Sequence, residues 1–409
     1  MRSRLLRLAA ARFARLAALL TLLAASAAQA EPTVILLSWD GVRHDEPDRV
    51  ATVALSRMQR EGARAERLVP VFPSNTFPGH LSLATGTFPD RHGIVDNQFI
   101  DRERGRFDMG SRVADWLEAE PLWVAAERQG VRSAVYFWVG SESDWRGHGA
   151  RYRMAPFDTK VSEAEKVQQI VRWLDLPAAE RPHLILAWWH GTDAESHRRG
   201  PDDPSVAEAL AQQDAQLAAL EKALDARSAW SDTTLLVVSD HGMTVATKPV
   251  PVRATLEGAG IRSRISDGST VAHVFLEDPA QLSRAEAVIS RLEGVRVYRR
   301  DTLPDALRLR HPTRTGDLVV IASPPYALRE SPLLERAARA LTFAKRGMHG
   351  YDPQLPEMGG IFFALGRGVP KGTKLGAVRM IDVAPTVARL LGIDPPAQSE
   401  GKPIEGIGP

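Results

Sequence analysis

Aspartate and histidine residues recur along this chain at spacings that suit a pair of bound metal ions. The candidate ligands are Asp40, Asp193, His197, Asp240, His241 and His349. Asp193 and His197 lie four residues apart and share one face of a helical turn, whereas Asp240 and His241 are adjacent. Since the chain has no cysteine, a transition-metal site must use histidine and carboxylate ligands, a set that suits catalytic zinc. This set is large enough for two ions with open positions, and such a pair can stabilise the attacking and leaving oxygens of phosphoryl transfer.

Thr76 is the candidate nucleophile. It lies in Pro73-Ser-Asn-Thr-Phe-Pro-Gly-His80, where small polar residues precede Pro78 and an apolar run. This pattern is typical of the start of a helix, where the backbone amides and the helix dipole favour an anion. A threonine hydroxyl attacks readily only when metal coordination lowers its pKa. The alternative for an isolated Thr76 is an ordinary helix cap.

Asn97, in Gly93-Ile-Val-Asp-Asn97, is the candidate donor to a phosphate oxygen, because its amide carries two N–H groups. The alternative is that it is a turn residue. His80 and His92 lie near these segments in the sequence. We interpret both as structural residues or as supporting groups behind the ligands.

Apolar runs that read as buried strands lead into three of the acidic ligands. The runs before Asp40, Asp193 and Asp240 are residues 33–38, 183–189 and 233–239, and a fourth run covers residues 133–138. In an open parallel sheet, ligands bind beyond the carboxyl ends of the strands, so we expect the three acids to meet there. Neighbouring acids repel one another unless a positive group lies between them. The alternative is that each acid caps the helix that follows it.

The rest of the pattern predicts an α/β fold with a mostly parallel central sheet and helices on both faces. The predicted helices that alternate with these strands cover residues 113–129, 162–174 and 204–226.

The stretch from about residue 250 to 345 interrupts this alternation and is interpreted as a small inserted α+β subdomain that covers one end of the sheet. Its predicted strand, helix, strand and strand are residues 271–276, 282–292, 295–299 and 317–322. The chain then returns with a strand at 360–365 and a final helix at 381–391. Residues 31–409 are therefore predicted to be one catalytic domain with this insert.

The first thirty residues differ from the rest in composition. A start rich in arginine and free of acids leads into the apolar run 16–27, and Ala28-Gln29-Ala30 supplies small residues for cleavage. We interpret residues 1–30 as a secretory signal peptide cleaved after Ala30, with an uncleaved N-terminal anchor as the alternative. The protein is then expected to be exported, periplasmic or secreted. The formal charge of +2 depends on the arginines of this segment, so we predict no nucleic-acid partner.

Taken in order, these segments resemble the nucleotide pyrophosphatase/phosphodiesterase family of the alkaline phosphatase superfamily. The matching stretches are residues 37–43, 73–80, 84–97, 193–201, 239–243 and 349–352. The resemblance implies an alkaline-phosphatase-like fold capped by the insert, and two zinc ions per chain. The chain departs from the family pattern at His190-Gly-Thr192, where an acid and a proline are usual, and at Gly79, where asparagine is common.

The resemblance also implies roles for the individual residues. One zinc is assigned to Asp193, His197 and His349, and the other to Asp40, Asp240 and His241, with Thr76 as its fourth ligand. Thr76 is implied to attack in line, form a phospho-threonine and release a nucleoside 5′-monophosphate from a small-molecule nucleotide. Asn97 and the backbone amide of Thr76 are implied to bind a non-bridging phosphate oxygen.

A nucleotide substrate is expected to stack its base on aromatic side chains. Phe77 directly follows Thr76, and Trp138 lies in a segment similar to one that lines the substrate pocket in the family. Tyr152 or Phe157 falls near the position of a second stacking ring. The alternative for each ring is packing in the core.

Two other functions stay open from the sequence. One is a related zinc hydrolase that acts on a choline-type lipid head group, a phosphonate or a phosphate monoester. The other is a metal-binding protein without turnover, against which the complete ligand set and Thr76 argue.

Overall fold

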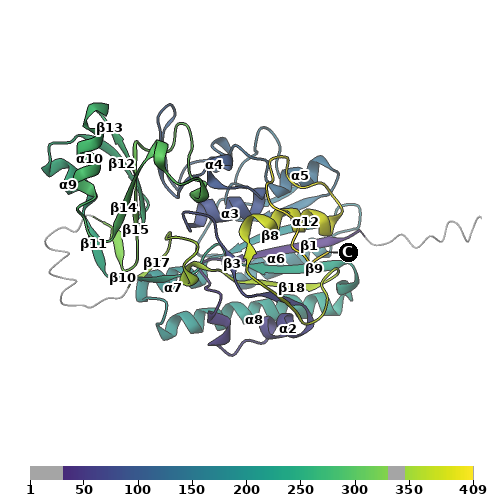
Figure 1. Ribbon diagram of the computed structural model, residues 1–409. Helices are drawn as coiled ribbons and strands as arrows, with labels where there is room; N and C mark the ends of the chain where they lie inside the picture. The colour runs from purple at the N-terminus through teal and green to yellow at the C-terminus, as the bar shows by residue number, and fades with distance from the viewer. Residues whose placement is uncertain (1–30, 330–345, 409) are drawn as a thin grey trace, which may run out of the picture. The chain divides into compact units, whose positions relative to one another are not determined.

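A sheet of eight strands lies at the centre of the computed structural model, which describes residues 31–329 and 346–408 (Figure 1). In spatial order the strands are β19 (Thr373–Leu375), β2 (Ala63–Ala65), β18 (Phe362–Gly366), β9 (Thr233–Val238), β1 (Thr33–Trp39), β8 (Leu184–Trp189), β6 (Ser133–Tyr136) and β7 (Tyr152–Met154). The predicted signal peptide, its cleavage site and the last part of the predicted insert, residues 330–345, lie outside the described residues.

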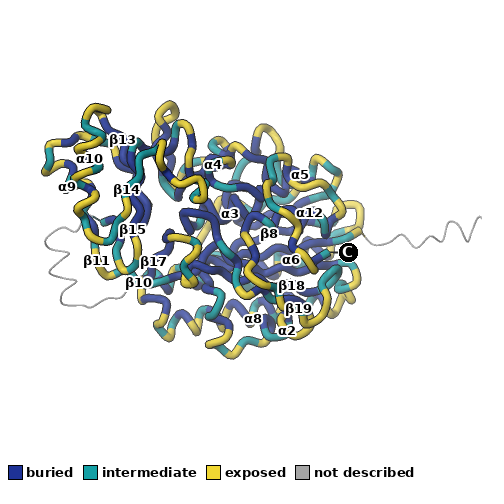
Figure 2. Tube along the Cα trace, viewed as in Figure 1, coloured by how far each residue is buried: buried dark blue, intermediate teal, exposed yellow. Residues whose placement is uncertain are grey.

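The sheet is mixed but mostly parallel. β9, β1, β8, β6 and β7 run parallel to one another, whereas β18 is antiparallel to both β9 and β2. Every residue of β1, β8 and β9 is buried, which accounts for their nearly continuous apolar sequences (Figure 2). The predicted α/β class with a mostly parallel sheet is confirmed.

Helices cover both faces of this sheet, as predicted; α2 and α8 lie on one side, and α3, α5 and α12 on the other (Figure 1). The helices are α2 (Ala54–Glu61), α3 (Thr76–Thr85), α4 (Pro89–His92), α5 (Leu122–Arg128), α6 (Glu163–Leu174), α7 (Gly191–Arg199), α8 (Pro204–Ala226) and α12 (Val383–Leu391). Two of them begin at strong signals. Ser162 and Glu165 form a capping box at α6, and Asp203 caps α8 just before Pro204.

The prediction of one helix over residues 113–129 is wrong. A short 3₁₀ turn, η2 (Val113–Asp115), is followed by irregular chain, and α5 begins only at Leu122. Pro121 explains the break, because its ring disfavours helical geometry at the preceding residue and it has no N–H to donate. Helical apolar spacing on both sides of Pro121 concealed the interruption.

A second sheet lies between β9 and β18 in the sequence and is antiparallel throughout. Its spatial order is β12 (Ser263–Asp267), β13 (Val271–Leu276), β15 (Leu318–Ala322) and β14 (Val295–Arg299). α9 (Val252–Gly258) and α10 (Leu282–Ile289) pack with it around a hydrophobic cluster separate from the main core.

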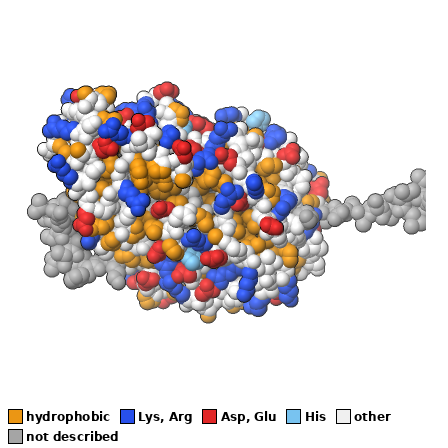
Figure 3. Space-filling model, in the orientation of Figure 1, with side chains coloured by type: hydrophobic (Ala, Val, Ile, Leu, Met, Phe, Trp, Pro, Cys, Tyr) orange, Lys and Arg blue, Asp and Glu red, His pale blue; other side chains and the backbone are white. Residues whose placement is uncertain are grey.

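Short strand pairs complete the described structure. They are β10 (Thr244–Ala246) with β17 (Arg346–Met348), β11 (Lys248–Val250) with β16 (Tyr326–Leu328), β3 (Leu68–Val69) with β20 (Val378–Arg379), and β4 (Phe99–Asp101) with β5 (Gly105–Phe107). Within the described ranges, no helix combines the length and hydropathy that a bilayer span requires. On the face drawn in Figure 3, basic and acidic side chains are interspersed around a central area rich in hydrophobic side chains.

Candidate active site

The three central strands bring three acidic residues together at their carboxyl ends. β1 pairs in parallel with β8 on one side and with β9 on the other. Asp40 directly follows β1, Asp240 lies just beyond β9, and Asp193 occupies the first turn of α7, which follows β8. The topology therefore places these acids at the edge where parallel sheets bind their ligands.

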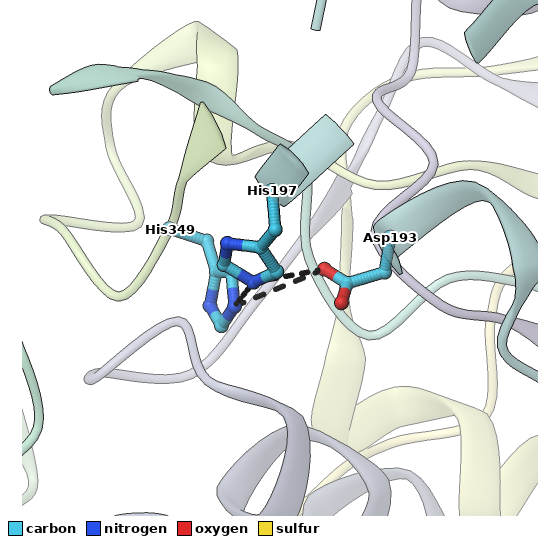
Figure 4. A group of neighbouring side chains, drawn as sticks. All are labelled: Asp193, His197 and His349. Carbon is cyan, nitrogen blue, oxygen red and sulfur yellow. Dashed lines mark hydrogen bonds and ion pairs between the residues drawn. The ribbon is translucent and has the colours of Figure 1, made fainter. Parts of the chain in front are cut away.

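Asp193, His197 and His349 form the first group of potential metal ligands (Figure 4). The Nε2 atoms of His197 and His349 lie 3.4 and 3.8 Å from the same oxygen, Asp193 Oδ1. The two Nε2 atoms are 3.0 Å apart. Asp193 and His197 come from adjacent turns of α7, whereas His349 directly follows β17, so the group exists only in the folded chain.

Asp40, Asp240 and His241 form the second group. His241 Nε2 lies 3.2 Å from Asp240 Oδ2 and 3.6 Å from Asp40 Oδ1, and all three residues are buried. The rings of His241 and His349 stack with their centroids 3.7 Å apart and their planes inclined by 12°. The two groups are therefore in direct contact and can serve one reaction centre.

Backbone carbonyl groups orient the histidines of both groups. The Nδ1 atoms of His197, His241 and His349 lie 3.0, 2.9 and 3.0 Å from the carbonyl oxygens of Gly347, Gly242 and Ser74. Because a carbonyl oxygen only accepts, each Nδ1 carries the hydrogen, and each neutral ring presents its lone pair at Nε2. The lone pairs of His197 and His349 thus face each other, an arrangement that a cation between them would stabilise.

Each of the three aspartates also has one buried oxygen without a hydrogen-bond partner among the described residues. These oxygens are Asp40 Oδ1, Asp193 Oδ1 and Asp240 Oδ2. A buried carboxylate oxygen that is left unpaired is costly unless a cation compensates it. Carboxylate oxygens and imidazole nitrogens that converge in this way fit divalent ions such as zinc.

The pKa values of the acids respond to this crowding. Burial raises the pKa of Asp40 well above its usual range, and the charges of Asp240 and Asp193 raise it further. Burial likewise raises the pKa of Asp193. At Asp240, burial acts in the same direction, but His241 and His80 outweigh it and lower the pKa. The cluster therefore favours a positively charged occupant.

Thr76 is the first residue of α3, and its hydroxyl lies beside the second group. The Oγ1 atom is 3.3 Å from Nε2 of His241. Asn75 precedes it in extended conformation, so the chain turns into the helix at Thr76. The hydroxyl consequently lies at a helix N-terminus, where the dipole and the free amides favour an anion.

Asn97 lies next to this helix start. Its Oδ1 accepts a hydrogen bond of 2.8 Å from the backbone N–H of Phe77, which leaves its NH₂ to donate to a phosphate oxygen. Asp96 holds the arrangement, because its Oδ1 accepts from both Asn75 Nδ2 and the backbone N–H of Asn97, each at 2.7 Å.

Two glycines allow these segments to approach one another. Gly41 has a φ of +72°, and a Cβ there would lie 2.9 Å from side-chain atoms of Asp193. A Cβ at Gly79 would lie 3.0 Å from Asp240. A side chain at Gly41 would also be strained at this φ, and one at Gly79 would require Asp240 to shift by a few tenths of an ångström.

A cavity of about 460 Å³ with mostly apolar walls is lined by Phe77, the residue after Thr76. Three of the predicted aromatic residues, Phe77, Trp138 and Phe157, line it. Phe157 stacks on Trp188 with a centroid distance of 4.4 Å and remains 40% exposed. Tyr152, in contrast, is not among the lining residues; it lies in β7, and its hydroxyl donates to the carbonyl of Glu180.

Three other histidines that were considered from the sequence are not members of either ligand group. His80 is fully buried, with Nδ1 2.9 Å from the carbonyl oxygen of Thr76 and 3.4 Å from Asp240 Oδ2. His92 is buried against Ser82, and burial lowers its pKa to about 3. His190 belongs to neither ligand group.

Two residues of the site were missed from the sequence. Trp188 lines the cavity and donates from Nε1 to Asp40 Oδ2 at 2.8 Å. Phe137 also lines the cavity and has a φ of +62°, which is unusual for a bulky side chain. Trp188 lies in a predicted strand just before a ligand loop, and alternation along that strand was the signal that could have placed it.

Comparison with known proteins agrees with this geometry. The profile of the type I phosphodiesterase/nucleotide pyrophosphatase family matches residues 34–352. An uncharacterised pyrophosphatase/phosphodiesterase of Schizosaccharomyces pombe is 30% identical over 396 residues, which cover 93% of this chain and 80% of that protein. The bis(5′-adenosyl)-triphosphatase of Xenopus laevis is 27% identical and aligns with 88% of this chain and 78% of its own length.

Solved structures show the same fold. Murine ectonucleotide pyrophosphatase/phosphodiesterase 5 superposes with a TM-score of 0.81 at 25% identity, covering 88% of this chain and 95% of the murine chain. A second structure of that protein, an inactive threonine-to-alanine variant in complex with AMP, gives the same TM-score and identity, and covers 89% of this chain and 96% of the murine one.

Proposed function

The chain belongs to the type I phosphodiesterase/nucleotide pyrophosphatase family of hydrolases, and on this basis we propose that it cleaves phosphodiester or pyrophosphate bonds of nucleotides with Thr76 as nucleophile. The observation that carries the proposal is the position of the Thr76 hydroxyl. It lies at the start of α3 and 3.3 Å from His241, in contact with one of two adjoining groups of metal-binding side chains. An ordinary cap would not require those groups.

Two zinc ions are the proposed cofactors. Asp193, His197 and His349 would hold one ion, and Asp40, Asp240 and His241 the other, with Thr76 as a further ligand. When bound, the ions would supply positive charge to the attacking and leaving oxygens. The convergent Nε2 lone pairs and the three unpartnered carboxylate oxygens support this assignment.

The chain's own residues account for the remaining steps. Thr76 Oγ1 attacks phosphorus, the bond from phosphorus to the leaving oxygen breaks, and the hydroxyl proton passes by way of solvent to that leaving oxygen. The Asn97 amide and the backbone N–H of Thr76 bind the non-bridging oxygen, on which negative charge develops. Water then cleaves the phospho-threonine, which restores Thr76 and releases a nucleoside 5′-monophosphate.

A nucleotide is the proposed substrate because of the cavity beside Thr76. Its aromatic walls suit the flat face of a base, and Phe77 lies one residue from the nucleophile. Two relatives agree with this: one is a bis(5′-adenosyl)-triphosphatase, and another was solved in complex with AMP. We also propose that the protein is exported, since residues 1–30 have the composition of a signal peptide.

Metal analysis combined with a substrate panel tests this function. The purified protein should hold two equivalents of zinc and cleave a nitrophenyl ester of thymidine monophosphate much faster than nitrophenyl phosphate or nitrophenyl phosphorylcholine. Equal rates on the three esters would refute the nucleotide assignment, and no turnover of any ester by the zinc-loaded protein would refute the hydrolase.

A further inference from the structure

Trp188 links the wall of the cavity to a metal-binding carboxylate. Its Nε1–H donates to Asp40 Oδ2 at 2.8 Å, whereas Asp40 Oδ1 has no hydrogen-bond partner among the described residues and lies 3.6 Å from His241 Nε2. An indole N–H can only donate, so this bond favours the ionised carboxylate. One oxygen of Asp40 is thereby occupied, and the other faces the ligand group.

The indole ring is held on several sides. Trp188 is the penultimate residue of β8, and the buried Nζ of Lys166 donates to its carbonyl oxygen at 3.0 Å. Its ring stacks on Phe157 and meets the edge of His80, whose centroid lies 5.1 Å away. The direction of the N–H is therefore fixed by packing and does not depend on Asp40 alone.

We propose that Trp188 is a positioning residue for Asp40. The indole N–H of Trp188 holds Asp40 Oδ2 and thereby turns Asp40 Oδ1 toward the cation of the second ligand group. This inference rests on the proposed function, since it concerns how that site holds its metal. It adds a residue that neither binds the metal itself nor belongs to the set of residues that the sequence motifs identify. Loss of the Trp188 N–H is expected to weaken metal binding, and to lower turnover because less metal is bound.

Trp189 provides a matched control in the same strand. Successive side chains of a strand point to opposite faces, so Trp189 faces away from the site and stacks on Trp39, with centroids 5.6 Å apart. Trp189 is fully buried, and its Nε1 has no hydrogen-bond partner among the described residues. Replacement by phenylalanine removes the same atoms at both positions, but only at Trp188 does it remove a bond to a ligand.

The experiment compares Trp188→Phe and Trp189→Phe as full-length proteins stripped of metal and titrated with zinc against a competing chelator. For Trp188→Phe we expect one of the two zinc equivalents to bind about 10- to 100-fold more weakly. Trp189→Phe should bind both equivalents as the wild type does, with a lower melting temperature of the metal-free protein.

Melting temperatures of the metal-free proteins separate positioning from general destabilisation. If Trp188→Phe and Trp189→Phe lose zinc affinity equally, or if neither loses any, the inference is overturned. A wild-type protein that takes up no zinc would overturn the proposed function together with the inference. Wild-type zinc affinity in Trp188→Phe would overturn the inference alone.

Discussion

Backbone carbonyl groups determine which ring nitrogen carries the hydrogen in the histidines of the site. Three carbonyl oxygens, those of Ser74, Gly242 and Gly347, fix the Nδ1–H tautomer of the three ligand histidines. The sequence motifs identify histidines but contain no information about which ring nitrogen faces the metal. That choice depends on where two loops and strand β17 place their carbonyl groups, and only the folded chain determines it.

The role of Thr76 leads to the most direct prediction at this scale. Thr76→Ala should lower kcat by more than about a hundredfold, which corresponds to roughly 2.7 kcal/mol of barrier, because no other hydroxyl occupies the helix start. Zinc content should be largely kept, since the six aspartate and histidine ligands remain. Steady-state kinetics with zinc analysis on the same sample measures both quantities.

Thr76→Ser is the matched control, because it keeps the hydroxyl and loses only a methyl group. It should retain measurable turnover and form a phosphorylated protein in acid-quenched reactions, whereas Thr76→Ala should form none. If Thr76→Ala keeps activity within about tenfold of the wild type, or ~1.4 kcal/mol, Thr76 is not the nucleophile.

At the scale of elements, the sequence was most informative where a helix is long or a strand is uniformly buried. The bounds of α8 and of β13 are those predicted, and β1, β8 and β9 were recognised as continuous apolar runs. Edge strands such as β7 were missed because three residues carry no periodicity. Tyr152 and Phe157 were the two alternatives for the second stacking ring. In the structure the hydroxyl of Tyr152, in β7, is bonded to Glu180, whereas Phe157 lines the cavity.

The contact between the inserted segment and β4 gives a prediction about stability. Arg314 is buried, and it donates from Nε to Asp101 Oδ2 at 3.0 Å and from NH1 to the carbonyl oxygen of Gly93. Arg314→Ala should lower the free energy of unfolding by about 3–5 kcal/mol, because Asp101 then keeps a buried charge without its cation. Urea denaturation followed by fluorescence measures the change.

Arg102→Ala provides the comparison for this measurement. Arg102 also pairs with an aspartate, Asp317, at 2.7 Å, but both side chains are partly exposed. Its removal should cost less than about 1 kcal/mol, because water screens the pair. Equal losses in the two variants would show that burial of Arg314 is not what makes its ion pair important.

At the scale of the whole molecule, titratable groups that are buried between elements make the stability depend on pH. His273 lies in β13, on the face opposite the side chains that join the hydrophobic cluster of the second sheet, and it is fully buried. Its Nδ1 accepts from the backbone N–H of Gly316. Burial lowers the pKa of His273 to about 4, whereas in the unfolded chain it titrates near its ordinary value of 6.5.

The unfolded state therefore binds more protons than the folded state between about pH 6.5 and pH 4, and stability falls as the pH decreases through that window. His273 alone should contribute up to about 1.4 kcal/mol per pH unit there. In His273→Asn, which keeps an acceptor for Gly316, the free energy of unfolding should fall less steeply by that amount. Urea denaturation of metal-free protein at pH 7, 6 and 5 measures both slopes; parallel slopes would contradict the prediction.

The wide separation of the ligands along the chain has a consequence for biosynthesis. A nascent chain displays Asp40 and the Thr76 segment first, the acids of β8 and β9 much later, and His349 only after the whole inserted segment has been made. A product truncated before His349 would possess the nucleophile and the complete second group but only Asp193 and His197 of the first. Proteolysis or premature termination before His349 is thus expected to remove one ligand of the first group and to abolish the proposed chemistry.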